Sequence, residues 1–355
     1  MNKKNFITIF EKTSVREAIK KLDTENLNSL CVIDKNGKMV GVFTDGDFRR
    51  SVLAGLDISK EVSPWINKDF KYLFNGCSEN QIKEIFISNV FIRDLPILNK
   101  KFKIIKVIKR EDVLTSSELR KENLKLKNIP VVVMAGGKGT RMDPFTRVLP
   151  KPLIPIGNEP IIKKILDQFR EFDVKNFYIS IYEKGEMIKA YFNSYKKNYN
   201  IKYIEEEKPL GTIGALSLIR DKLKKTFFVT NCDILIEHHY PSIFEFHRKN
   251  KYDLTLAASL RDFSIPYGVC DVDINGKLLS MNEKPHYNFL VNTGLYIIEP
   301  RVLKLIPNNK LFNINDLITE IKKNNMRTGV YPISDKSWLD LGNWNEYSNV
   351  LDKKF

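Results

Sequence analysis

The chain has 355 residues, of which 43% are hydrophobic. This length exceeds what a single hydrophobic core usually holds, so two domains are expected. The formal net charge of +15 suits an anionic partner, but most of the excess is lysine on polar helix faces without an aromatic and basic motif, which argues against nucleic acid. No stretch holds the roughly 18 uninterrupted apolar residues of a membrane span, so no membrane partner is expected. The four cysteines form no CxxC pair, which favours the reducing cytoplasm.

The first third of the chain contains an internal repeat. Residues Val32-Ile33-Asp34-Lys35 match Ile97-Leu98-Asn99-Lys100 at an offset of 65 residues, without gaps. In each copy a helix-like segment precedes a hairpin, at residues 14–22 and 78–86, and the first hairpin turns at Asn36-Gly37. The pattern predicts two successive β-α-β-β-α modules.

The repeat resembles a tandem pair of CBS domains, which are α+β regulatory modules that often bind adenine nucleotides. The family's Gly-x-x-Thr-x-x-Asp ending appears here as Gly41, Thr44 and Asp47, and the resemblance implies that Thr44 and Asp47 contact the ribose or phosphate of a regulatory nucleotide. The second copy departs from this ending, with Lys106 and Lys109 in the glycine and threonine positions. Two alternatives stay open, because Thr44 could serve only as a helix cap and the pair could be a packing module without a ligand. The two copies span residues 1–60 and 61–118.

A polar stretch, predicted as a linker helix over residues 119–128, separates the repeat from a second domain at residues 129–355. This domain begins with a buried strand at residues 131–134. Strand-like runs then alternate with helical stretches at residues 160–172, 186–195 and 212–219. The alternation predicts an α/β domain with a mainly parallel sheet covered on both faces, and ligands of such sheets bind beyond the carboxyl ends of the strands.

A glycine-rich loop follows the strand at residues 131–134 and reads Ala135-Gly136-Gly137-Lys138-Gly139-Thr140-Arg141. Glycines allow main-chain N–H groups to approach phosphates closely. The loop is not a Walker A motif, because Gly139 stands where that motif requires serine or threonine. It is not the dinucleotide fingerprint either, because Met142 stands where a third glycine is required. A phosphate-binding loop of another type is predicted.

The loop and the residues after it resemble the sugar nucleotidyltransferase family, whose opening pattern runs here from Gly137 to Thr146 and continues at Pro150-Lys151-Pro152-Leu153. The resemblance spans residues 128–350 and implies a GT-A-like, Rossmann-like fold. Further segments match in the family's order: Pro209-Leu210-Gly211-Thr212 with Gly214, Asn231-Cys232-Asp233, Tyr267-Gly268, Glu283-Lys284-Pro285, Asn292-Thr293-Gly294, and Trp338-Leu339-Asp340-Leu341-Gly342.

The resemblance implies a role for each matched segment. Asp233 and Asp340 are expected to bind Mg²⁺, which takes one or two carboxylates together with phosphate oxygens. The expected nucleotide-binding residues are Ala135, Gly136, Gly137, Gly139, Thr140, Arg141, Lys151, Pro209, Leu210, Gly211, Thr212 and Gly214. Among them, the segment from Pro209 to Gly214 resembles the loop that contacts the base, where small residues let a purine or pyrimidine lie against the main chain. The expected sugar-phosphate-binding residues are Tyr267, Gly268, Glu283, Lys284, Asn292, Thr293 and Gly294.

These residue types suit a phosphoryl transfer in which a sugar phosphate oxygen attacks the α-phosphorus of a nucleoside triphosphate and pyrophosphate leaves. Negative charge must then be gathered and neutralised. We expect Arg141 to clamp the leaving phosphates, Lys151 to lie at the α-phosphate and Lys284 to lie at the attacking phosphate. No protein nucleophile is required, because the attacking phosphate is already ionised. Three histidines show no ligand pattern and are interpreted as structural or exposed: His238, His239 and His247.

The order of the two domains resembles that of the glucosamine-1-phosphate guanylyltransferases of bacterial legionaminic acid biosynthesis. This resemblance implies GTP and glucosamine-1-phosphate as substrates and is compatible with a homodimer. Transfer to mannose-1-phosphate or another hexose-1-phosphate is the main alternative. A nucleotide sensor without catalytic activity is an alternative of another class. The joint presence of all five charged residues argues against a sensor: Arg141, Lys151, Asp233, Lys284 and Asp340.

Overall fold

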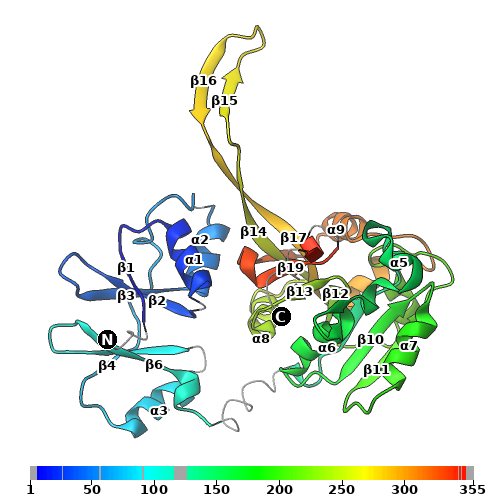
Figure 1. Ribbon diagram of the computed structural model, residues 1–355, viewed down its shortest axis with the longest axis horizontal. Coiled ribbons are helices and arrows are strands. Elements are labelled where there is room, and N and C mark those ends of the chain that lie inside the picture. The colour runs from blue at the N-terminus through cyan, green and yellow to red at the C-terminus, as the bar shows by residue number, and fades with distance from the viewer. Residues whose placement is uncertain are drawn as a thin grey trace. The chain divides into compact units, whose positions relative to one another are not determined.

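The computed structural model divides the chain into unit 1, residues 1–124, and unit 2, residues 125–355 (Figure 1). The described residues are 6–25, 27–55, 57–89, 92–115, 126–342, 344 and 346–348. The predicted linker helix at residues 119–128 lies outside them up to residue 125. No helix of the described part is both long and apolar enough to cross a bilayer.

Unit 1 contains two three-stranded sheets with the same strand order. In the first, β1 (Thr8–Phe10) runs parallel to β2 (Ser29–Ile33), which pairs antiparallel with β3 (Met39–Thr44). In the second, β4 (Leu73–Phe74), β5 (Asp94–Leu98) and β6 (Ile104–Lys109) repeat this arrangement. The ladders of the two hairpins match residue for residue at the offset of 65, including a bulge at the same position, so the predicted repeat is confirmed.

Equivalent helices precede the two hairpins, and each begins at a serine cap. These are α1 (Val15–Thr24), capped by Ser14, and α3 (Glu79–Ser88), capped by Ser78. The helices after the hairpins differ: α2 (Asp45–Leu53) begins at a Thr44 capping box, whereas the described part of the second copy continues only as the 3-10 helix η1 (Arg110–Asp112). The predicted closing helix of the second copy is therefore wrong in this region, because Lys109 supplies no side-chain cap where Thr44 does.

The two copies pack against each other within unit 1. The hydroxyl of Ser29 donates to Oδ2 of Asp94 at 2.7 Å, and these two residues occupy equivalent positions of the repeat. Burial raises the pKa of Asp94, and the hydrogen bond from Ser29 partly offsets this. Cys31, Met39 and Leu98 form a shared buried cluster beside the pair, so the copies form one module.

Unit 2 is built on a seven-stranded sheet, with β17 as the antiparallel member among otherwise parallel neighbours. The mainly parallel α/β sheet predicted from the sequence is confirmed. In spatial order its strands are β11 (Asn200–Glu205), β10 (Asn176–Ile181), β7 (Val131–Met134), β12 (Phe227–Asn231), β17 (His286–Ile298), β14 (Leu254–Ser264) and β18 (Thr328–Ile333).

Separate buried clusters cover the two faces of the sheet. One cluster includes α6 (Ile161–Arg170), α7 (Gly185–Asn193) and α8 (Tyr240–Lys249). The other includes α9 (Ile314–Lys323) and the 3-10 helices η5 (Gly214–Ile219) and η6 (Pro300–Leu305). Two of the three helices predicted for this domain are confirmed as α-helices, at residues 160–172 and 186–195. The segment predicted at 212–219 forms a 3-10 helix, η5. Before it, the main-chain N–H groups of Thr212 and Ile213 donate to Asn313 and Phe312, and the Thr212 hydroxyl accepts from the N–H of Ile314, instead of starting a regular helix.

Smaller elements surround the main sheet. Two short ladders are β8 (Pro155–Ile156) with β9 (Glu159–Pro160), and β13 (Ile234–Ile236) with β19 (Trp338–Asp340). A long ribbon leaves the sheet where β14 and β17 extend beyond it, and it ends in the hairpin of β15 (Gly268–Val272) and β16 (Leu278–Glu283) (Figure 1). Short helical turns complete the chain: η3 (Thr140–Met142), α5 (Phe145–Val148), η4 (Lys151–Leu153) and η7 (Asp335–Ser337).

Candidate functional site

Four of the five charged residues predicted from the sequence meet at the carboxyl ends of β7 and β12, where a parallel sheet places its ligands: Arg141, Lys151, Asp233 and Asp340. The glycine loop leaves β7, and Asp233 follows β12 by two residues. A third segment joins them, because β13 pairs with β19 and so brings Asp340 opposite Ile234. The main-chain N–H of Leu341 donates to the carbonyl of Asp233 at 2.8 Å, which fixes the two segments together.

Lys151 is the buried cation of this site, with only 7% of the residue exposed. Its ammonium group donates to Oδ2 of Asp233 at 2.5 Å and to the carbonyl of Gly342 at 3.3 Å. A buried ammonium needs such partners, because an unpaired charge in a protein interior is costly. Arg141 lies further out, with its Nη2 4.0 Å from the same carboxylate oxygen and its side chain mostly exposed.

Asp233 and Asp340 point toward a common place beside Gly342. A β-carbon added to Gly342 would lie 2.7 Å from Oδ1 of Asp340, 3.2 Å from Oδ2 of Asp233 and 3.6 Å from Nη2 of Arg141. The main-chain N–H of Gly342 donates to Oδ1 of Asp340 at 2.7 Å. Two convergent carboxylates beside the glycine loop fit Mg²⁺, which completes its shell with phosphate oxygens and water. Among the described residues, no group of three or more His, Cys, Asp or Glu side chains gathers as a metal cage would.

The thiol beside the metal-binding candidate is inert. Burial, followed by the charge of Asp233, raises the pKa of Cys232 to about 12. A thiol that stays protonated is a poor nucleophile, so Cys232 is a weak candidate for that role. All four cysteines of the chain are free thiols.

The glycine loop is held by two residues that the sequence analysis did not single out. Ser180 accepts hydrogen bonds at its Oγ from the N–H groups of Ala135, at 2.9 Å, and Gly136, at 3.3 Å. The Glu206 carboxylate fills the space beside Gly136, where a β-carbon would lie 2.1 Å from it, and accepts from the N–H of Leu210 at 3.1 Å. Burial raises the pKa of Glu206. Their positions in the sequence could have identified Ser180 and Glu206, because both residues lie at the carboxyl ends of the neighbouring strands β10 and β11.

The three loop glycines thus have different surroundings. Gly136 faces Glu206, and Gly137 has nothing within 4 Å of its β-carbon direction. Gly139 has a left-handed φ of +70° and would place a β-carbon 2.9 Å from Thr146 Cγ2 and 3.1 Å from Lys151 Cβ. Of the three loop glycines, Gly137 is therefore the one with free space in its β-carbon direction, where a ligand can lie.

The predicted base-contacting loop at residues 209–214 is fixed to the segment before α9. A β-carbon on Gly211 would lie 2.7 Å from the carbonyl of Phe312, and one on Gly214 would lie 2.8 Å from the carbonyl of Lys310. Thr212 accepts at Oγ1 from the N–H of Ile314 at 2.9 Å. Small residues are predicted in this loop because they let a base lie against the main chain. In the structure they also let the segment at residues 310–314 lie close to the loop.

The predicted sugar-phosphate residues fall into two groups. The first group, Asn292 to Gly294, lies on β17 next to the carboxyl end of β12. A β-carbon on Gly294 would lie 2.5 Å from Nδ2 of Asn231. Thr293 is buried, and its hydroxyl donates to the carbonyl of Ala257 at 2.8 Å. This group lies beside the candidate site.

The second group lies on the projecting ribbon. Tyr267 is 73% exposed, Gly268 pairs with Glu283, and Lys284 has a left-handed φ of +47° at the end of β16. The N–H of Lys284 donates to the carbonyl of Tyr267 at 3.2 Å. Figure 1 shows this hairpin extending away from the sheet, so the structure does not bring these residues to Asp233 and Asp340.

In unit 1 the predicted regulatory residues form a helix cap. Thr44 Oγ1 accepts from the N–H of Asp47 at 3.3 Å and donates to Oδ2 of Asp47 at 2.6 Å, while that carboxylate oxygen also accepts from the N–H of Thr44 at 2.8 Å. Asp47 is 1% exposed and is also paired with Arg50. Gly41 has a packing role, because a β-carbon there would lie 2.9 Å from the carbonyl of Asn67. The cap explains Thr44 and Asp47 without a ligand, and their binding role stays a prediction.

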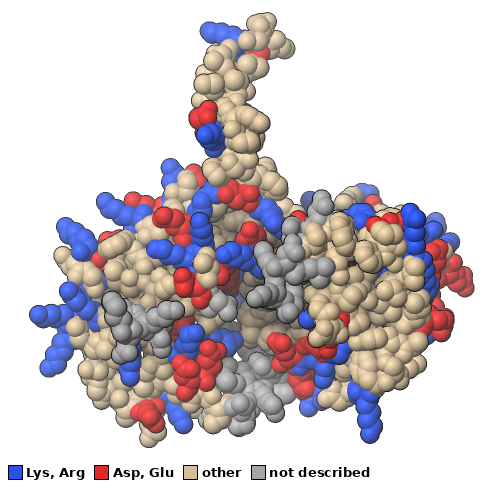
Figure 2. All heavy atoms as spheres, viewed as in Figure 1, with Lys and Arg blue, Asp and Glu red and all other residues tan. Residues whose placement is uncertain are grey.

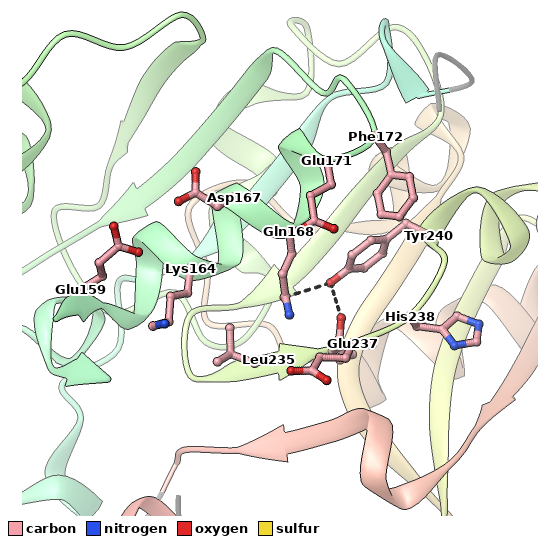
Figure 3. Close-up of a pocket in the computed structure, with 11 residues that line it drawn as sticks. Glu159, Lys164, Asp167, Gln168, Glu171, Phe172, Leu235, Glu237, His238 and Tyr240 are labelled. Carbon is pink, nitrogen blue, oxygen red and sulfur yellow. Dashed lines mark hydrogen bonds between the residues drawn. The ribbon is translucent and has the colours of Figure 1, made fainter. Parts of the chain in front are cut away.

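A separate cavity of about 490 Å³ opens beside α6 and β13 (Figure 3). The Tyr240 hydroxyl in its wall has two acceptors for its single hydrogen, the carbonyl of Ile236 at 3.0 Å and Gln168 Oε1 at 3.3 Å. Burial and the neighbouring carboxylates raise the pKa of Glu171. This lining repels phosphates, so the cavity is not the nucleotide site. Its acidic residues are Glu159, Asp167, Glu171 and Glu237.

The histidines have structural partners. His238 and His239 contact Tyr331 and Ser242 through ring nitrogens. His247 is buried, with Nδ1 2.8 Å from Thr255 Oγ1, and burial lowers its pKa.

Comparisons with known proteins agree with this division of the chain. A family model described as nucleotidyl transferase matches residues 130–354, and the CBS domain model matches residues 1–54. The mannose-1-phosphate guanyltransferase of Saccharomyces cerevisiae is 35% identical over 185 residues, covering 49% of this chain and 51% of that protein. The UTP–glucose-1-phosphate uridylyltransferase of Synechocystis sp. is 29% identical over 248 residues, covering 63% of each. This chain thus spans about half the length of the first relative and less than two thirds of the second.

The fold also occurs among solved structures. The crystal structure of HddC from Yersinia pseudotuberculosis is similar to 63% of this chain and 99% of its own, with a TM-score of 0.50 and 24% sequence identity. This likeness concerns the fold of unit 2.

Replacing Gly139 by alanine should destabilise unit 2, whereas the same change at Gly137 should not. Of these two glycines, Gly139 alone combines a positive φ with close neighbours in the β-carbon direction. We expect Gly139→Ala to lower the free energy of unfolding by about 2 kcal/mol and Gly137→Ala to change it by less than about 0.5 kcal/mol. Scanning calorimetry of the full chain measures both. Equal stability of the two variants would show that the loop does not have this conformation in solution.

Proposed function

The chain belongs to the nucleotidyl transferase family, and on this premise we propose that it is a Mg²⁺-dependent sugar-1-phosphate nucleotidyltransferase. The reaction joins a nucleoside triphosphate to a sugar-1-phosphate, yielding a nucleoside diphosphate sugar and pyrophosphate. One observation carries the proposal. The carboxylates of Asp233 and Asp340 and the guanidinium of Arg141 each have an atom within 3.6 Å of one point beside Gly342. The buried ammonium group of Lys151 donates to the Asp233 carboxylate. Phosphoryl transfer requires such a gathering of cations and metal-binding groups.

The charge and the burial of each residue indicate its role in the proposed reaction. The open side of Gly137 admits phosphates to the loop, and Arg141, which is mostly exposed, reaches toward the departing pyrophosphate. Lys151, fixed by Asp233 and the carbonyl of Gly342, offers its ammonium to the α-phosphate. Mg²⁺ held by Asp233 and Asp340 would neutralise charge on the phosphate oxygens. Lys284 is proposed to hold the attacking sugar phosphate.

We propose GTP as the nucleotide, supported by the relatives named as guanyltransferases. For the sugar, the order of the two domains supports glucosamine-1-phosphate, as in the legionaminic acid type of pathway, whereas these relatives are named for mannose-1-phosphate. Mannose-1-phosphate is therefore the second candidate. The CBS pair is proposed to bind an adenine nucleotide that changes the activity of unit 2.

Replacing Asp340 by asparagine should lower kcat at least ~10²-fold, the scale of removing one preorganised electrostatic partner. Asparagine keeps the shape and still offers an oxygen to the N–H of Gly342, so the fold should persist. Asp335→Asn is the matched control, because Asp335 is an exposed carboxylate only five positions away. Pyrophosphate release at saturating Mg²⁺ is the measurement. Near-normal turnover of Asp340→Asn would remove this residue from the site.

The substrate pair can be identified from initial rates of pyrophosphate release. Four nucleoside triphosphates are each tested with glucosamine-, N-acetylglucosamine-, mannose- and glucose-1-phosphate. We expect GTP with glucosamine-1-phosphate to give the fastest release. The ratio of rates between amine and hydroxyl sugars can reach 10⁴-fold or so, because a site that hydrogen-bonds a polar substituent strongly disfavours a sugar that lacks it. Faster turnover with mannose-1-phosphate would select the second candidate. If no pair releases pyrophosphate, a nucleotide sensor is the better description.

Binding of AMP tests the regulatory role of unit 1, because AMP lacks the leaving pyrophosphate of a substrate. We expect calorimetry on the full chain to show binding that is weakened at least ~5-fold by Thr44→Val, which removes the hydroxyl but keeps the size. Scanning calorimetry of the variant without AMP separates loss of the helix cap, worth about 1 kcal/mol, from loss of a ligand contact. If calorimetry shows no heat of binding at millimolar AMP, the result would favour a packing module without a ligand.

A further inference from the structure

One residue of the opening pattern, Thr146, has no role in the proposed reaction, although it ends the segment that carries Arg141. Arg141 lies on the 3-10 turn η3, which Gly139 and Asp143 cap at its two ends. The Arg141 side chain is 70% exposed and reaches the Asp233 carboxylate only at 4.0 Å. The path of the main chain through η3 therefore determines where the guanidinium can lie.

Thr146 contacts both ends of η3. The residue is buried, and its hydroxyl has two acceptors for its single hydrogen, Oδ1 of Asp143 at 2.8 Å and the carbonyl of Gly139 at 3.1 Å. Its methyl carbon Cγ2 lies in the β-carbon direction of Gly139. The hydrogen bond from Thr146, followed by that from Arg147, lowers the pKa of Asp143. One side chain thus fixes the residues before and after the turn.

Lys184 in turn holds the main chain of Thr146. Its ammonium group donates to the carbonyl of Thr146 at 2.6 Å and to the carbonyl of Arg147 at 2.9 Å. Both carbonyls belong to the short helix α5. The last carbonyls of a helix lack partners within it and favour a cation. Lys184 therefore connects α5 to the turn between β10 and α7.

The local structure disfavours a lysine at position 184. The residue has a left-handed φ of +61° and is the N-cap of α7, which it caps without a side-chain hydrogen bond. Helices prefer Ser, Thr, Asp, Asn or Gly at this position, and a cation is unfavourable at the N-terminal end of a helix. A residue with a β-carbon also rarely takes a positive φ. The contact with α5 accounts for this lysine, whereas its own turn does not.

Position, and not charge, distinguishes Lys184. Figure 2 shows lysine and arginine side chains scattered over the visible surface of the molecule, so positive charge alone indicates little. The preceding residue, Glu183, lies 3.4 Å from Nζ of Lys138 in the glycine loop, and both side chains are about half exposed. An exposed ion pair of this kind adds little stability. The hydrogen bonds of Lys184 to main-chain carbonyls are therefore the more specific of the two contacts.

We propose that Thr146 and Lys184 are positioning residues, which hold η3 so that the Arg141 guanidinium meets the leaving phosphates of the nucleoside triphosphate. The inference rests on the proposed function for the role of Arg141. Both residues act through Arg141 and need no contact with the substrate. Lys151 is held separately, by partners after β12 and β19. Loss of the contact should therefore affect the triphosphate more than the metal-binding carboxylates.

Hydrogen exchange of the full chain without substrates tests the hold on η3. The N–H of Met142 donates to the carbonyl of Gly139 at 2.9 Å, so its exchange reports whether η3 is formed. Lys184→Met keeps the length of the side chain but removes the donor. We expect this variant to speed exchange in residues 139–147 at least ~5-fold, the scale of one net hydrogen bond.

Lys189→Met is the matched control. Lys189 lies on α7 and donates to the carboxylates of Glu186 and Glu205 at 2.7 and 2.6 Å, so this variant loses the same number of hydrogen bonds outside the loop. Exchange in residues 139–147 should then equal that of the wild type. Because Lys184 is exposed, scanning calorimetry should show an unchanged midpoint of unfolding for Lys184→Met.

Kinetics test the effect on Arg141. With the fastest substrate pair, Lys184→Met and Thr146→Val should each lower kcat/KM for the nucleoside triphosphate at least ~10-fold, because a displaced group loses much of its effect on the reacting centre. The KM for the sugar phosphate should be almost unchanged. Lys184→Arg and Thr146→Ser keep the donors, so both should recover most of the wild-type rate.

Two kinds of result would overturn the proposal. One is exchange in Lys184→Met that equals that of the wild type, or that Lys189→Met raises equally. The other is faster exchange in an active enzyme whose kcat/KM for the triphosphate is unchanged, or whose loss of activity neither Lys184→Arg nor Thr146→Ser repairs. An inactive wild type in which Lys184→Met speeds exchange would confirm the hold on η3 and count against the proposed function alone.

Discussion

The buried ammonium group of Lys151 connects three segments that lie far apart in the sequence. It belongs to the turn after the glycine loop, and its partners are the Asp233 carboxylate after β12 and the carbonyl of Gly342 after β19. Because a buried charge without partners is costly, each segment is constrained by the other two. The ladder between β13 and β19 then determines where Asp340 lies, and the convergence of the two carboxylates follows from it.

Glycines make this convergence sterically feasible. Gly342 leaves room for both carboxylates, and Gly139 lets the loop pass over the side chains of Thr146 and Lys151. The sequence predicts that the glycines allow close approach of a ligand, whereas in the structure most of them allow close approach of the protein itself. Gly137 is the loop position that keeps an open side. The same residue type therefore serves assembly of the site at some positions and access to it at another.

Much of this arrangement could be predicted because it depends on local patterns. The 65-residue offset, the alternation of strands and helices, and the carboxylate after an apolar strand are all visible in order along the chain. Ser180 and Glu206 were missed because their importance arises from strand order, which places β10 next to β7 and β11 beyond it. After β6 the described residues up to 115 form only η1, where Lys109 supplies no side-chain cap in the position of Thr44. The projection of the hairpin of β15 and β16 beyond the sheet could not be predicted, because alternation along a strand does not say where that strand loses its neighbours.

On the proposed function, recognition of the base and of the sugar rests on structurally independent elements. The loop at residues 209–214 is fixed to residues 310–314, and the ribbon that ends in β15 and β16 extends from β14 and β17 on the other side of β12 in the sheet. A change in one element therefore need not disturb the other. The relatives of this chain are named for guanyl transfer to mannose-1-phosphate and for uridylyl transfer to glucose-1-phosphate, which is the kind of recombination that independent elements permit. The Lys151–Asp233 pair lies between these elements and would act on the phosphates, the part of the substrates that does not change.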